Sequence, residues 1–156
     1  MSGVAAARRL RPVLTVAALV ATTSLSACGG DPTADYCAEV EARQSALSAA
    51  VADGAATGLL SALPELEELA AAAPDDLVDE WAVVTERLGG LQKALSAAGI
   101  DDPAGYDPTD PPEGVSAAQV ERIRAAASAL DTPEMRTAFN AVQQQARDVC
   151  KTPLVR

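Results

Sequence analysis

The sequence predicts an all-α fold: a small bundle of four to five helices with a long proline- and aspartate-rich crossover, closed by a disulfide between Cys37 and Cys150. Three observations carry this prediction. Apolar residues after residue 33 recur at spacings of three and four, which is the period of an amphipathic helix. No segment shows the alternation of apolar and polar residues that is typical of a strand. Cys37 and Cys150 bracket nearly all of the helical sequence.

Residues 1–27 have the composition of an export signal. Arg8, Arg9 and Arg11 form a positive cluster, and an apolar run follows over residues 13–20. A positive flank, a short apolar core and small residues before a cleavage site are the three parts of a secretory signal. The apolar run is too short to cross a bilayer as a helix, which takes about 20 residues.

The segment Leu25-Ser26-Ala27-Cys28-Gly29 resembles the lipobox of bacterial lipoproteins. The resemblance implies cleavage before Cys28 and a diacylglyceryl group on its thiol, which supplies the two acyl chains that stable anchoring generally takes. We therefore expect a lipidated tether over residues 28–33, a helical domain over residues 34–156, and attachment to the bilayer at the extracytoplasmic face of the cell membrane. The alternative is a cysteine that merely lies in an ordinary signal peptide.

Charge and composition exclude several partners. The full chain carries a formal net charge of −10, and removal of residues 1–27 takes away three arginines and no acid, which leaves −13. An acidic surface is repelled by phosphate, so we expect no nucleic acid partner. Only 3% of the residues are aromatic and much of the apolar fraction is alanine, so we expect a thin core without a large ligand cavity.

The two remaining cysteines, Cys37 and Cys150, form an even pair in an oxidising compartment. We expect a disulfide between them that closes a loop of over 100 residues. In the chain-entropy model such a loop contributes about 4.7 kcal/mol of stability. The alternative is a pair of free thiols in a metal or redox site, which the absence of histidine and of a C-x-x-C pair disfavours.

Two helices are expected in the first part of the domain. The first covers residues 33–52, and its apolar stripe is broken once, by Gln44. Gly54 and Gly58 are expected to bracket a turn before a second helix over residues 59–73. Pro64 either kinks this second helix or marks its true start, because proline lacks an N–H group and clashes with the preceding turn.

Residues 77–98 show the clearest helical pattern in the chain. The apolar positions are Leu77, Trp81, Val84, Leu88, Leu91, Leu95 and Ala98. Asp75 or Asp76 is expected to cap this helix and Gly99 to end it. Gly89-Gly90 either permits close approach of a neighbouring helix or marks a bend. Trp81 is expected to pack in the core, with an interface anchor as the alternative.

The second part of the domain follows a connection over residues 100–115 that is rich in proline and aspartate. Ser116 is expected to cap the next helix, with Gln119 at the capping-box position. Thr132 and Pro133 have the residue types of a cap and a first helical residue, so they predict the start of the last helix.

The disulfide constrains the topology, because it needs Cα atoms within about 7 Å. Strict alternation of five helices would place Cys37 and Cys150 at opposite ends of the bundle. We therefore expect the 100–115 connection to cross the length of the bundle, so that the helix after it runs parallel to the helix before it. The competing arrangement joins the last two helices into one bent helix of a four-helix bundle.

Several features recur together along the mature chain. They are the lipobox, Tyr36-Cys37, Ala73-Pro74-Asp75-Asp76 before a helix with tryptophan, a linker ending Pro111-Pro112-Glu113-Gly114-Val115, and Val149-Cys150-Lys151-Thr152-Pro153 near the end. In these the chain resembles small, uncharacterised helical lipoproteins of actinobacterial type. The resemblance implies an envelope location and a helical fold, and it implies no activity.

The residue types do not favour catalysis. There is no histidine to act as a general base, and no lysine lies in a nucleophile motif, so we expect no enzyme and no cofactor. Asp101, Asp102, Asp107 and Asp110 are candidate ligands for Ca²⁺, which takes about six to eight oxygen atoms. Capping and turn formation are the alternative role for these four aspartates.

We expect a non-enzymatic protein-binding or scaffold module that acts on another protein of the cell envelope. The alternative is a lipoprotein that binds a small ligand or a cation such as Ca²⁺. An exposed apolar patch larger than a few hundred Å² would favour the first function. A concave pocket with converging polar groups would favour the second.

Overall fold

The computed structural model describes residues 31–52 and 54–156, and these ranges contain helices, turns and loops but no strand. The elements are α1 (Pro32–Ala52), α2 (Ala55–Ser61), α3 (Leu63–Ala71), α4 (Val78–Ser96), the 3-10 turn η1 (Pro103–Gly105), α5 (Ala117–Ala129) and α6 (Pro133–Asp148). The all-α prediction is confirmed. The expected export signal and Cys28 lie outside the described residues.

The expected helix over residues 59–73 is two helices, α2 and α3, which meet at Ala62. Pro64 lies in the first turn of α3, so it marks a true helix start. Gly58 does not bracket a turn as expected, because it lies inside α2. A Cβ atom on Gly58 would come within 2.0 Å of the carbonyl oxygen of Ala50, so glycine is what lets α2 pack closely against α1.

The start of α4 differs from the predicted one. Leu77 occupies the cap position, and no side chain accepts a hydrogen bond from the first turn, so the expected capping by Asp75 or Asp76 is wrong. The backbone N–H of Leu77 instead donates to the carbonyl of Pro74 at 2.9 Å, which forms a turn that leaves both aspartates exposed. The end of α4 is as predicted, because Gly99 has a φ of +73° just beyond it.

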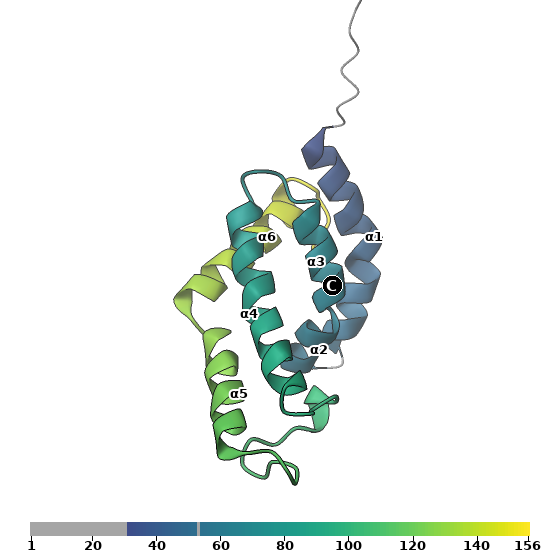
Figure 1. Ribbon diagram of the computed structural model, residues 1–156. Coiled ribbons are helices and arrows are strands. Elements are labelled where there is room, and N and C mark those ends of the chain that lie inside the picture. The colour runs from purple at the N-terminus through teal and green to yellow at the C-terminus, as the bar shows by residue number, and fades with distance from the viewer. Residues whose placement is uncertain (1–30, 53) are drawn as a thin grey trace, which may run out of the picture.

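The chain alternates in direction along four columns, which are α1, α2 with α3, α4, and α5 with α6 (Figure 1). The side-chain amide of Gln119, early in α5, donates to the carbonyl of Ala97, just after α4, at 2.9 Å. Arg87 in the middle of α4 forms an ion pair of 2.9 Å with Glu134 at the start of α6. Both α5 and α6 therefore run antiparallel to α4.

The expected crossing of the bundle by residues 100–115 is thus wrong. This connection begins and ends at the same end of the bundle, where α4 stops and α5 starts (Figure 1). The competing four-column arrangement is correct, with a break at Thr132, whose side chain accepts the N–H of Met135 and starts α6. An even number of columns brings Cys37 and Cys150 to one pole without a crossing, and they form the predicted disulfide with their Cα atoms 4.9 Å apart.

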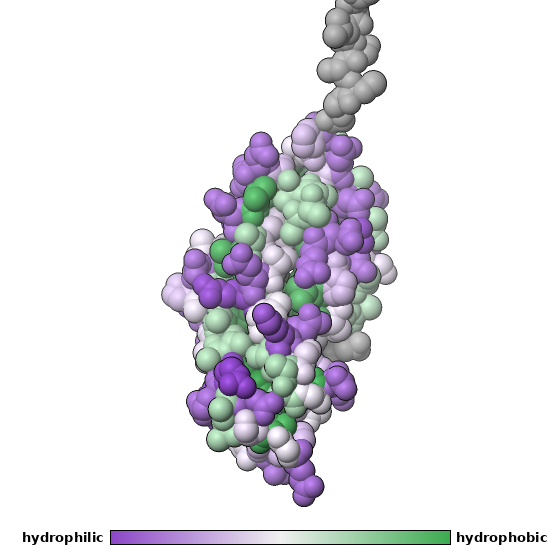
Figure 2. Space-filling model, viewed as in Figure 1, coloured by the Kyte–Doolittle hydropathy of each residue, from purple (hydrophilic) through white to green (hydrophobic). Residues whose placement is uncertain are grey.

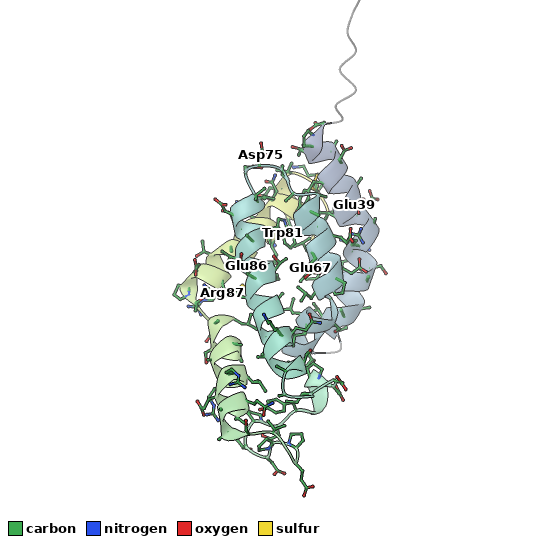
Figure 3. The ribbon with its side chains drawn as sticks, in the orientation of Figure 1. Glu39, Glu67, Asp75, Trp81, Glu86 and Arg87 are labelled. Atoms are coloured by element: carbon green, nitrogen blue, oxygen red, sulfur yellow. A yellow bond between two sulfur atoms is a disulfide. The ribbon has the colours of Figure 1, made fainter. Side chains whose placement is uncertain are left out.

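The core lies between the four columns. Trp81 of α4 is only 1% exposed, and its indole N–H donates to the buried hydroxyl of Tyr36 at 3.2 Å. Figure 3 shows Trp81 in the space between α3 and α4. The expectation that Trp81 packs in the core is confirmed, and its indole is not available as an exposed interface anchor.

The last residues of the chain form a strap along α1 that the sequence did not reveal. Leu154 of this strap, residues 151–156, is buried in the core. The side-chain amide of Gln44 donates to the carbonyl of Pro153 at 2.5 Å, and the N–H of Arg156 donates to the hydroxyl of Ser48 at 3.1 Å. Gln44 therefore interrupts the apolar stripe of α1 because it binds the strap.

Candidate functional site

The four aspartates considered as Ca²⁺ ligands have local roles in the 100–115 connection. Asp102 caps η1, since its Oδ1 accepts the N–H of Ala104 at 3.0 Å. Asp107 Oδ1 accepts both the hydroxyl and the N–H of Thr109 at 2.7 Å, and these hydrogen bonds lower the pKa of Asp107 below its ordinary value. Across residues 31–52 and 54–156, no three acidic or cysteine side chains gather to hold a metal ion.

A hollow lies under this connection, and we call it the linker pocket. It measures about 210 Å³. Its apolar walls are formed by Leu60, Leu91, Leu95, Tyr106, Ile123 and Ala127. Pro103 and Pro108 of the connection close over it, and Thr57 and Arg124 are its other lining residues.

The pocket follows from the way the 100–115 connection folds back on the bundle. Leu91 and Leu95 continue the apolar stripe of α4 to its C-terminal end, beyond the part of α4 that packs against α6. There α5 presents Ile123 and Ala127, and the connection covers the remaining gap with prolines and Tyr106. In Figure 2 hydrophobic and hydrophilic residues alternate over this lower end of the molecule.

Tyr106 is the chemically distinctive residue of the linker pocket. Its hydroxyl oxygen is buried from solvent and has no hydrogen-bond partner within the described structure. A buried hydroxyl without a partner costs about 1–3 kcal/mol. The hydroxyl is inaccessible to solvent, so it lies behind the pocket wall, and the surface that Tyr106 presents to the pocket is its ring.

A second hollow of about 330 Å³ adjoins the linker pocket, and we call it the acidic cleft. The two hollows share the wall residues Thr57, Leu60 and Pro103. The other lining residues of the acidic cleft are Gly58, Ser61, Gln92, Asp101, Asp102 and Ala104. Among the described residues, two carboxylates and no basic side chain therefore line this cleft.

Sequence reasoning missed this site, although it singled out the right segment. The aspartates drew attention to residues 100–115, whereas the pocket is built by the apolar members of that segment. Tyr106 was the available signal, because it is a single aromatic residue among prolines and acids in an exposed connection. Of the four candidate aspartates, the structure brings Asp101 and Asp102 into one cleft and leaves Asp107 and Asp110 outside it.

No model of a known protein family, no curated protein and no solved structure matches the chain. None of the helices in the described ranges has both the length and the hydrophobicity to span a membrane. Function must therefore be inferred from the geometry and chemistry of the site itself.

Proposed function

We propose that the protein is a lipoprotein anchored at the extracytoplasmic face of the cell membrane through Cys28, and that its helical domain binds a small, mainly apolar ligand in the linker pocket. The anchoring is supported by the N-terminal sequence. The binding function is supported by one observation, the concave apolar pocket under the 100–115 connection.

The size of the pocket limits the ligand. Drug-sized ligands occupy about 300–1,000 Å³, whereas an apolar cavity of about 150 Å³ holds one benzene molecule. At about 210 Å³ the linker pocket fits a single aromatic ring or a short alkyl chain. The sequence led us to expect a protein-binding module instead, but the large hydrophobic residues exposed in the described ranges are only Val78 and Val149, which gives little apolar surface for a partner.

The pocket is placed well for a ligand that arrives from outside the cell. Pro32, the first residue of α1, lies at one pole of the bundle, and the 100–115 connection lies at the other (Figure 1). The 21 residues of α1 span about 31 Å at 1.5 Å per residue. A domain anchored through Cys28 can thus present its pocket on the side away from the bilayer.

The anchoring is tested by intact-mass analysis of the protein from the envelope fraction. We expect a chain that begins at Cys28 and carries diacylglycerol, and we expect Cys28→Ser to abolish both the added mass and the membrane association. An unprocessed or unmodified chain in the soluble fraction would refute the anchoring.

Ligand binding is tested by filling the pocket. Ala127 is exposed at the pocket wall, so Ala127→Phe places a ring in the pocket without disturbing the core. Ala125→Phe is the matched control on the same helix, because Ala125 is exposed and does not line the pocket. Calorimetry with 2-phenylethanol should show binding that Ala127→Phe abolishes and Ala125→Phe preserves. Equal binding to both variants would show that the alcohol does not occupy this pocket.

A further inference from the structure

We propose that the ligand is an amphiphilic cation, with its apolar part in the linker pocket and its positive group in the acidic cleft. This inference rests on the proposed binding function and names the chemical class of the ligand. It follows from the arrangement of the two hollows, from the charges that line them, and from the overall charge of the chain.

The two hollows lie side by side, with the linker pocket as the apolar half of the proposed site and the acidic cleft as its more polar half. They share Thr57, Leu60 and Pro103, so one molecule of modest size can reach both across the same wall. The apolar half excludes water from a ring or an alkyl group, which supplies affinity through the hydrophobic effect. The polar half keeps a charged group hydrated at the surface, so the ligand's charge is not buried at a high cost.

The charges select a cation. Asp101 and Asp102 line the cleft, and the capping bond of Asp102 occupies only Oδ1, so its second carboxylate oxygen remains an acceptor. Arg124 is the only basic side chain that lines the linker pocket among the described residues, and it is paired with Glu121 on α5. The site as a whole is therefore negative, and a bound anion would meet two unbalanced carboxylates.

The electrostatic field of the whole protein also favours a cationic ligand. The formal net charge of the full chain is −10, and a negative protein raises the local concentration of cations near its clefts. This attraction is screened over about 8–10 Å at physiological salt. Selectivity for a cation should therefore be largest at low ionic strength and should decline when salt is added.

The test uses three probes that share a phenyl ring and differ in charge: 2-phenylethylamine, 2-phenylethanol and 3-phenylpropanoate. Their dissociation constants are measured by calorimetry at low ionic strength with the full chain as the cell processes it, reconstituted in phosphatidylcholine nanodiscs, and a titration of empty nanodiscs is subtracted. We expect the amine to bind about tenfold more tightly than the alcohol, and the carboxylate to bind most weakly.

Two double variants locate the selectivity. Asp101→Asn with Asp102→Asn removes both charges from the cleft, and asparagine at position 102 keeps an oxygen that can cap η1. Asp110→Asn with Glu113→Gln removes two charges from exposed residues of the same connection that line neither hollow. The first variant should bring the amine to the affinity of the alcohol, and the second should leave most of the tenfold preference in place.

The outcomes separate this inference from the proposed function. If alcohol and amine bind equally to the unmodified chain and Ala127→Phe abolishes both, the pocket binds ligands and the inference of a cation is wrong. If the two double variants reduce the preference equally, the cleft does not select the charge and the inference is again wrong. If no probe binds, or if Ala127→Phe changes nothing, the proposed function fails and the inference fails with it.

Discussion

The disulfide joins the two ends of the described fold, and its removal has a calculable effect on stability. Cys37 and Cys150 are 113 residues apart. In the chain-entropy model the cross-link removes an entropy of 2.1 + 1.5R ln n cal/mol/K from the unfolded chain, which for this loop is about 4.8 kcal/mol at 25 °C. A domain of this size has a net stability of about 5–15 kcal/mol. Cys37→Ala with Cys150→Ala should therefore remove a third or more of the free energy of unfolding.

The structure indicates where the loss should appear first. The strap after Cys150 is held to α1 by the hydrogen bonds of Gln44 and Ser48 and by the buried Leu154. Without the disulfide these contacts alone hold the C-terminal strap near α1. Amide hydrogen exchange should thus speed up in residues 151–156 and in the N-terminal half of α1 before it does so in α4.

The measurement is urea unfolding followed by far-UV circular dichroism, for the double variant and for the unmodified chain under reducing conditions. We expect both to lose about 3–5 kcal/mol. The double variant with and without reductant is the control, and it should unfold at the same urea concentration in both because it has no Cys37–Cys150 disulfide to lose. A loss below about 1 kcal/mol would refute the reasoning, because the cross-link would then not restrict the unfolded chain as the chain-entropy model requires.

Three further predictions concern single side chains, and each is measured as the free energy of unfolding in urea. Gly58→Ala should lower the free energy of unfolding by about 2 kcal/mol or more, because the new Cβ meets the Ala50 carbonyl. Gly90→Ala is the control, since its Cβ meets nothing within 4 Å, and it should raise the free energy of unfolding by up to about 1 kcal/mol. Equal effects of the two substitutions would contradict the close packing of α2 on α1. Tyr106→Phe should stabilise the unliganded protein by about 1 kcal/mol, and a loss of stability would show that the hydroxyl has a partner. Burial raises the pKa of Tyr36, so the folded state keeps the phenol proton at a pH where the unfolded chain has released it; stability should hold below about pH 10 and fall above it, less steeply in Tyr36→Phe.

The features that sequence predicted best are those encoded by neighbouring residues. Ser116 and Gln119 form the reciprocal capping box, and Thr132 with Pro133 starts α6, because each of these devices lies within one turn of helix. Asp75 and Asp76 have equally suitable side chains and still do not cap α4. Whether a local signal is used depends on the path of the chain, and here a turn from Pro74 places Leu77 at the cap position.

The order and direction of the helices depend on contacts between residues that are far apart in the sequence. The disulfide was predicted correctly, and it excluded strict alternation of five columns. It did not distinguish a crossing connection from a four-column bundle, since both bring Cys37 and Cys150 together. That choice is made by contacts such as Gln119 to Ala97, whose partners are 22 residues apart and have no pattern in common. The strap along α1 was missed for the same reason, because its one sequence signal was a polar residue, Gln44, in an apolar stripe.

The linker pocket limits one argument from composition, because a small hollow of about 210 Å³ forms although no large cavity was expected. The high alanine content predicted a thin core without a large ligand cavity, because small side chains let helices approach closely. Small side chains leave no cavity only where the facing helix lies close enough to pack against them. At this end of the bundle α5 buries only Ile123 well, and Ala127 faces the long side chains of Leu91 and Leu95. The break before Pro133 separates α5 from α6, which packs on the other end of α4, so α5 does not close the gap. The 100–115 connection covers the space instead, and the same small residues that thin the core elsewhere leave an apolar hollow here.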